Sequence, residues 1–227
     1  MKKKACILAC LLIGATVGGG LEQRSIANPA VFDSKTQAAD ISEPGGELSN
    51  LILTLQDLPP GFTEMSPDEV ANFRNQLTQG PAFQPGSVFG YQKIDRNLFQ
   101  FQMLIGFTVQ LSEPMQQANF DKAIREGTAA KAFYEGLNSK KELQFTNPSA
   151  LTLPDNIGEV SAGWRSQGKI ENIPMNVDMT LFRRGKIGAF TTIFYIDGTK
   201  PSITISEAAR KLDSRMMELK PDLTKPQ

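Results

Sequence analysis

The stretch FQFQMLIGFTVQL, residues 99–111, decides the fold. Its odd positions all carry large apolar residues, whereas most of its even positions carry glutamine, threonine or glycine. This period of two is typical of a β-strand that has one apolar face and one mostly polar face. Residues 87–94 read as a second strand, and Asp95-Arg96-Asn97 between the two fits a tight turn. The sequence therefore predicts an antiparallel hairpin.

Three further strands are predicted in the C-terminal half, over residues 158–170, 175–183 and 186–197. The last of them is apolar on both faces, with isoleucine, alanine and tyrosine on one face and phenylalanine and isoleucine on the other. A strand of this kind is usually covered on both sides. We therefore expect an α+β fold, in which a mainly antiparallel sheet of about five strands is flanked by helices on both faces.

Two capping boxes mark the starts of helices. Ser66 and Glu69 begin a helix that we expect to run to about residue 77. Thr204 and Glu207 begin another, which places alanine, leucine and methionine on one stripe as far as about residue 219.

Other helical segments are predicted by apolar spacing alone. Residues 48–55 carry leucine and isoleucine at helical intervals, and residues 112–141 form a longer helical region. Gly127 and Gly136 are expected to interrupt that region. Residues 143–156, which contain two prolines, read as a loop.

The chain divides into four predicted parts. Residues 1–20 have three lysines, an apolar run too short to span a bilayer and then three glycines, which is the pattern of a signal peptide. Residues 21–47 are a flexible lead-in, residues 48–220 a single α+β domain and residues 221–227 a disordered tail. No later apolar run is long enough for a membrane span, so we expect the exported domain not to cross a membrane.

Both cysteines of the chain, Cys6 and Cys10, lie in the predicted leader. Cys10 comes too early in the apolar run for a lipoprotein cleavage site, so no lipid anchor is expected there. Lysine and arginine total 24, as do aspartate and glutamate, and loss of the leader removes three lysines. A weakly acidic domain has no general attraction for nucleic acid, and no nucleic-acid partner is expected.

Histidine is absent from the sequence. Its absence excludes Ser-His-Asp and Cys-His nucleophile systems, and with the leader removed no thiol remains for a zinc or iron–sulfur centre. We therefore expect neither a metal site nor a cofactor. Carboxylate chemistry is still open through Asp155, Glu159, Asp178 and Asp197, although their spacing selects no facing pair.

A cluster of positive charge is predicted at the tip of a hairpin. Arg183, Arg184 and Lys186 surround Gly185, where a tight turn is expected. Arginine forks suit carboxylates, so the cluster is a candidate docking patch for an acidic partner or an anionic ligand. The alternative is a turn that merely keeps the end of the sheet soluble.

Three aromatic residues on predicted strands, Trp164, Phe107 and Tyr195, are candidates for the lining of a ligand pocket. Aromatic side chains in strands are more often part of the core, and that alternative stays open here.

Three short motifs carry a resemblance. DLPPGF at residues 57–62, IGEVS at residues 157–161 and FRRGKI at residues 182–187 resemble blocks of exported cyanobacterial proteins without a characterised activity, and of extracellular sensor domains of actinobacterial Ser/Thr kinases. The order of elements is similar to the PsbP-like fold of lumenal photosystem II accessory proteins. The resemblance implies an exported, non-catalytic binding or accessory domain. The kinase sensor domains carry cysteines that this domain lacks.

Three functions follow as hypotheses. The first is a non-catalytic accessory protein of the periplasm or thylakoid lumen that contacts a protein complex, and not an enzyme. The second is a carrier of a small apolar ligand bound near Trp164 and Phe107. The third is a carboxylate-dependent hydrolase.

Overall fold

The computed structural model describes residues 48–77, 85–95, 97–139, 142–154 and 156–224. The predicted signal peptide (residues 1–20) and lead-in (21–47) lie outside the described residues, and so do both cysteines and Asp155. Of the helices in the described ranges, none combines the length and the apolar character needed to cross a bilayer.

Eight antiparallel strands form one sheet, in the order β1-β2-β3-β8-β7-β6-β4, and β5 also pairs with β6. The prediction of about five strands is therefore corrected to eight. The five long strands are the predicted ones, but the other three have only two or three residues and are too short to show an alternating pattern. Two of these short strands lie in the segment predicted to be a loop. The strands are β1 (Thr63–Glu64), β2 (Ser87–Asp95), β3 (Gln100–Gln110), β4 (Leu143–Phe145), β5 (Ser149–Leu151), β6 (Val160–Ile170), β7 (Ile173–Arg184) and β8 (Ile187–Ile196).

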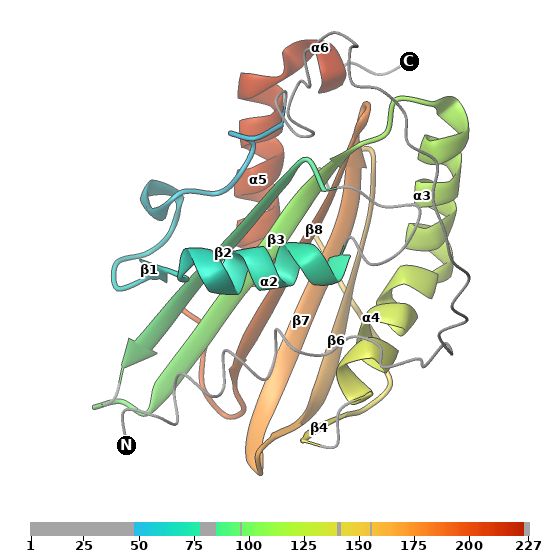
Figure 1. Ribbon diagram of the computed structural model, residues 1–227. Helices are drawn as coiled ribbons and strands as arrows, with labels where there is room; N and C mark the ends of the chain where they lie inside the picture. The colour runs from blue at the N-terminus through green and yellow to red at the C-terminus, as the bar shows by residue number, and fades with distance from the viewer. Residues whose placement is uncertain (1–47, 78–84, 96, 140–141, 155, 225–227) are drawn as a thin grey trace, which may run out of the picture.

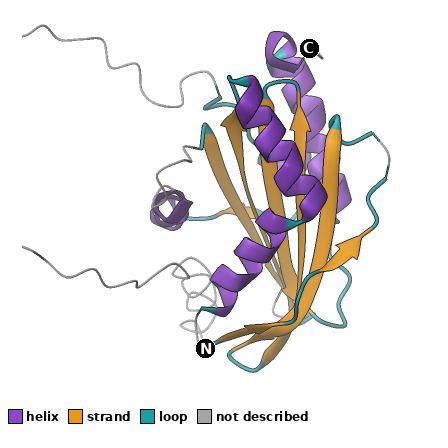
Figure 2. Cartoon of the chain, turned by 90° about the vertical axis from the view of Figure 1, so that its right-hand side faces the viewer, coloured by secondary structure: helices purple, strands orange, loops and turns teal. Residues whose placement is uncertain are grey.

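Helices cover both faces of the sheet, as predicted. One face carries α2 (Pro67–Leu77), α3 (Pro114–Glu126) and α4 (Thr128–Asn138), and the other carries α5 (Ile205–Leu219). Figure 1 shows α2 crossing in front of the strands and α5 behind them, and Figure 2 separates the two helical layers. Each layer has its own apolar core, because successive residues of the long strands point to opposite faces. The α+β class is thus confirmed, while the likeness to PsbP remains a prediction.

The helical region between β3 and β4 breaks once. Gly127 ends α3 in the left-handed conformation (φ 67°), as its position in the sequence predicts. Gly136 stays inside α4, so the break predicted there is wrong. An interior glycine costs a helix only about 1 kcal/mol, and α4 buries Tyr134 and Leu137 against the sheet.

The segment predicted as a helix over residues 48–55 is not one. It is a turn followed by extended chain that leads into the short 3₁₀ helix η1 (Leu55–Asp57). The Ser87 hydroxyl donates to the Leu51 carbonyl at 2.9 Å, and the Tyr91 hydroxyl donates to that of Leu53. These side chains of the sheet bind carbonyl groups that a helix would need for its own backbone hydrogen bonds. An isolated helix of this length is also marginal in water.

The C-terminal residues are ordered further than predicted. Residues 221–224 form the short helix α6 (Pro221–Thr224), so the predicted disordered tail is corrected for these four residues. The backbone N–H of Lys186 donates to the Leu223 carbonyl at 2.7 Å. Gly185 allows this approach, since a Cβ there would lie 2.1 Å from the Leu223 oxygen.

Candidate functional site

An open groove of about 760 Å³ lies at the β6 edge of the sheet, beside α3. Its floor is residues 160–164 of β6. Ile124 and Arg125 of α3 form one wall, and Ala150, Leu151, Leu153, Pro154 and residues 156–159 form the other. Most of these residues are apolar or small. We call this feature the Trp164 groove; in Figure 2, α3 and this side of the molecule face the viewer.

Trp164, the single tryptophan of the chain, lines the groove but is largely buried, with 9% of its surface exposed. Its indole lies against the α3–α4 junction, where a Cβ on Gly127 would stand 3.3 Å from Nε1. Glycine is therefore required at residue 127 both for its positive φ and for contact with the indole. The side chain belongs to the core and to the groove at once.

The three aromatic residues predicted to share a pocket do not come together. Phe107 stacks on Phe190, with ring centroids 4.9 Å apart, in the core beneath the helices. Tyr195 lies on the opposite face of the sheet, because its neighbour Phe194 occupies the Trp164 face of β8. Of the predicted trio, only Trp164 lines the groove.

Arg183 is engaged within the molecule. Its Nε and Nη2 donate to the two carboxylate oxygens of Asp121 on α3, at 2.6 and 2.9 Å. Its Nη1 donates to Glu159 Oε2 and to the Gly185 carbonyl, both at 2.8 Å. Hydrogen bonding to Asp121 is the main reason that the pKa of Arg183 is raised. Only 12% of the side chain is exposed.

Arg184 makes the equivalent contact on the other face. Its Nε and Nη2 donate to the two oxygens of Asp213 on α5, at 2.7 and 2.5 Å, and this pairing raises the pKa of Arg184. Asp213 is almost completely buried and also accepts from the Gly158 N–H at 3.1 Å. The two arginines thus belong to the framework of the fold and are not presented as a cationic surface. A docking role for Lys186, on the same hairpin, stays a prediction.

The charge network holds one wall of the groove in place. Glu159 accepts from Gly185 N–H at 3.0 Å in addition to Arg183, and its own N–H donates to the Arg183 carbonyl at 2.7 Å. Gly158 has φ +63°, and a Cβ there would lie only 2.5 Å from the same carbonyl oxygen. The IGE and FRRG motifs therefore meet, and the wall that they build is fixed before anything binds.

Three of the four carboxylates proposed for hydrolysis lie among the described residues, and each of these three accepts hydrogen bonds. Both oxygens of Asp178 accept from Arg165, at 2.6 and 2.7 Å, and both oxygens of Glu159 are engaged as described above. Asp197 accepts from Asn176 at 2.8 Å. Among the described residues no three acidic, histidine or cysteine side chains gather as metal ligands do. Among Glu159, Asp178 and Asp197 the structure shows no facing pair of available acids, and Asp155 lies outside the described residues.

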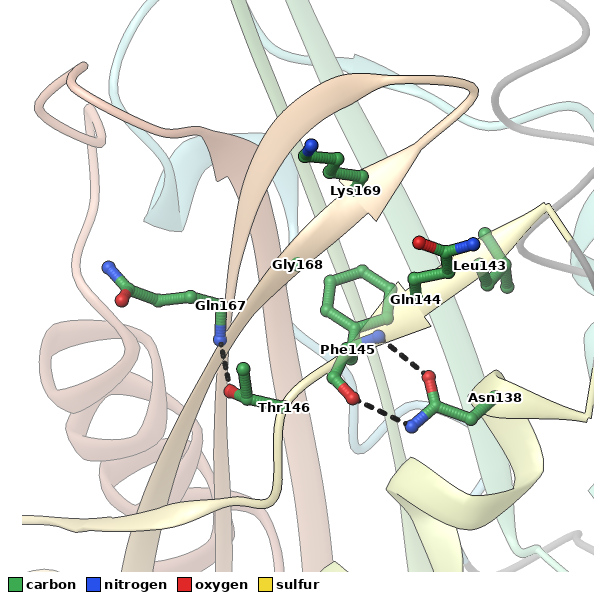
Figure 3. Close-up of a pocket in the computed structure, with 8 residues that line it drawn as sticks. All are labelled: Asn138, Leu143, Gln144, Phe145, Thr146, Gln167, Gly168 and Lys169. Atoms are coloured by element: carbon green, nitrogen blue, oxygen red, sulfur yellow. Dashed lines mark hydrogen bonds between the residues drawn. The ribbon is translucent and has the colours of Figure 1, made fainter.

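A second hollow lies where the end of α4 meets the edge of the sheet (Figure 3). The Asn138 amide accepts from the Phe145 N–H at 2.7 Å and donates to the Phe145 carbonyl at 2.8 Å. One side chain therefore completes the outer edge of β4 as a neighbouring strand would. The lining consists of Asn138, Leu143, Gln144, Phe145, Thr146, Gln167, Gly168 and Lys169.

The partners of the two arginines were not apparent in the sequence. Asp121 and Asp213 sit on amphipathic helices among other charged residues, where acids are normally solvated. On α5, Asp213 follows Ala209 of the apolar stripe by four residues, and it is buried with that stripe. The two adjacent arginines near the end of a strand do indicate buried acidic partners. Alternation directs their side chains to opposite faces of the sheet, and each face is covered by a helix.

No protein-family model matches the sequence, and no curated protein sequence matches it. Among solved structures the chain is similar to LpqN of Mycobacterium tuberculosis, described as involved in cell envelope biogenesis. The similarity covers 69% of this chain and 78% of that one, with 13% sequence identity and a TM-score of 0.31. A likeness this remote carries no argument about function.

Proposed function

We propose that the protein is an exported, non-catalytic binding or accessory protein of the periplasm or thylakoid lumen, and that it contacts its partner through the Trp164 groove. One observation carries the proposal: the groove is open and lined by Trp164 and several aliphatic side chains, while the acid on its rim, Glu159, is bound to Arg183. Such a surface suits recognition of shape and of apolar side chains, and Glu159, the acid among the described lining residues, is engaged by hydrogen bonds.

The size and stiffness of the groove support this function. Ligand sites are typically concave, apolar and about 300–1,000 Å³, with a few polar groups that fix orientation. The wall around Gly158 is anchored to Asp213 and Arg183, so little chain has to be ordered when a partner binds.

A carrier of a small apolar ligand is the second candidate. It is favoured by the apolar side chains that line the same groove as Trp164, which include Leu151, Leu153 and Val160. Under this alternative the protein leaves its host with a bound small molecule, and removal of that molecule changes the fluorescence of Trp164.

The test is site-specific photo-cross-linking in the native host. A photoreactive residue at position 153, in the groove, is compared with one at Lys211, an exposed residue of α5. We expect an adduct with a defined partner from position 153 and none from position 211. Equal adducts from both positions, or turnover of any substrate by the purified protein, contradict the proposal. A small molecule found by native mass spectrometry, without a protein adduct, supports the carrier instead.

A further inference from the structure

The backbone of β6 has one outward-facing residue that lacks a strand partner. Thr146 N–H donates to the Gln167 carbonyl on the outer side of β6. Alternate residues of a strand direct their N–H and C=O groups to the same side, so Arg165, Gly163 and Ser161 also face outward. The short strand β5 pairs with Arg165 and Gly163. No strand in the described part of the chain pairs with the outer side of Ser161.

The neighbouring parts of this edge are protected. The Asn138 amide closes β4 at Phe145 (Figure 3). The edge strand β5 has three residues and stands between Pro148 and Pro154, which keeps it too short to recruit another strand. Ser161 is different, because it lines the Trp164 groove, and by the alternation described above its N–H and C=O face the open edge of β6.

We infer that the Trp164 groove binds an extended polypeptide segment, which adds to the edge of β6 by pairing with the backbone of Ser161. This inference rests on the proposed function and specifies its partner. The Ser161 N–H donates to a carbonyl of the bound segment, and the Ser161 carbonyl accepts from an N–H of the same segment. A purely apolar ligand satisfies neither group.

The groove also selects the side chains of the segment. An extended chain presents alternate side chains to opposite sides, and here one side meets Ile124 and Trp164 while the other meets Leu151 and Leu153. Apolar residues at alternate positions therefore fit.

The α3 wall adds a preference for an acidic residue. The Arg125 side chain is 66% exposed, and Asp121, whose carboxylate lies 3.8 Å from it, already accepts two hydrogen bonds from Arg183. The Arg125 guanidinium therefore retains donors for a carboxylate of the bound segment.

The test begins with a random octapeptide library displayed on phage and selected on the full chain. Selected peptides are synthesised, and their binding is followed by the fluorescence of Trp164, the single tryptophan. Ser161→Pro removes the outward N–H without removing a hydrogen bond to β7, because a proline whose missing N–H faces outward is tolerated at a sheet edge. We expect Ser161→Pro to weaken binding about tenfold and Ser161→Ala to leave it unchanged.

A second arm leaves the protein unaltered. Each peptide is N-methylated at one backbone position at a time, and we expect methylation to abolish binding at the position that pairs with Ser161 and to be tolerated at its neighbours. Equal binding of all methylated peptides, or equal affinities for Ser161→Pro and Ser161→Ala, overturns the inference. If a fluorescent fatty acid quenches Trp164 while no peptide is selected, the inference fails but the proposed function survives as a carrier. If neither probe binds, both fail.

Discussion

Two arginines that are neighbours in the sequence bind carboxylates on opposite faces of the sheet. Arg183 reaches Asp121 on α3, and Arg184 reaches Asp213 on α5. Both arginines were candidates for a docking patch, with a solubilising turn as the alternative, and the structure shows both engaged within the molecule instead. A charge-reversal experiment at these positions would break the fold before it tested any partner.

At the residue scale we predict that Arg184→Met lowers the free energy of unfolding by about 3–5 kcal/mol, because it leaves the buried Asp213 carboxylate unpaired. Urea denaturation measures the change. Lys186→Met, on the same hairpin, is the control and is expected to change stability by no more than about 0.5 kcal/mol. The double variant Arg184→Met/Asp213→Leu should recover much of the loss, because no buried charge then remains. Similar stabilities for Arg184→Met and the wild type would contradict the role of the pair.

At the scale of elements, the sequence predicted those strands and helices whose formation depends on their own residues. The five long strands and the helices α2 and α5 follow from alternation and from capping boxes. The strands β1, β4 and β5 and the turn at Leu48 depend on contacts with distant segments, such as the one between Ser87 and Leu51. In the site, the strand pattern predicted Trp164 as a lining residue. The other walls of the groove come from α3 and from the loop before β6, and the pattern of one strand does not predict where those segments lie.

The junction between α3 and α4 gives a prediction with a matched control. Gly127 and Gly198 both have positive φ, at 67° and 78°. A Cβ at Gly127 meets the Trp164 indole, whereas one at Gly198 meets nothing within 4 Å. We expect either glycine-to-alanine change to cost about 1–2 kcal/mol in backbone strain, measured by denaturation. Only Gly127→Ala should alter Trp164 emission; an unchanged spectrum would show that the indole is not held as described.

The start of α5 gives a second prediction at this scale. Hydrogen bonds from the Thr204 hydroxyl and backbone N–H lower the pKa of Glu207. Because the pKa is lower in the folded state, this carboxylate stabilises the fold at neutral pH, and its contribution is lost as the pH falls below about 4.5. Because Glu207 is exposed and its charge is screened by solvent, Glu207→Gln should cost no more than about 0.5 kcal/mol at pH 7, and the cost should shrink as the pH falls below 4.5. Glu218→Gln, an exposed change on the same helix, should show no such difference.

At the scale of the whole molecule, the chain has three tyrosines and all of them are buried. Tyr134 lies in the core under α4, and Tyr91 and Tyr195 lie in the core on the other face. Burial is the main cause that raises the pKa of Tyr91 and of Tyr195 to about 12, and it raises that of Tyr134 too. Each phenol must therefore stay protonated for its side of the sheet to remain packed.

This burial predicts an alkaline unfolding transition. Because the pKa of each phenol is higher in the folded than in the unfolded chain, the stability that it contributes is complete below about pH 10 and falls as the pH rises toward 12. Phenolate absorbance and circular dichroism should change together, in one cooperative step, since ionisation of a tyrosine opens one of two cores that share the same sheet. Tyr195→Phe should lessen the loss of stability between pH 9 and pH 11.5 while also removing the hydrogen bond to Asp178 at neutral pH. Early ionisation of one phenol with the circular dichroism unchanged would show that its core opens locally and that the two faces are not coupled.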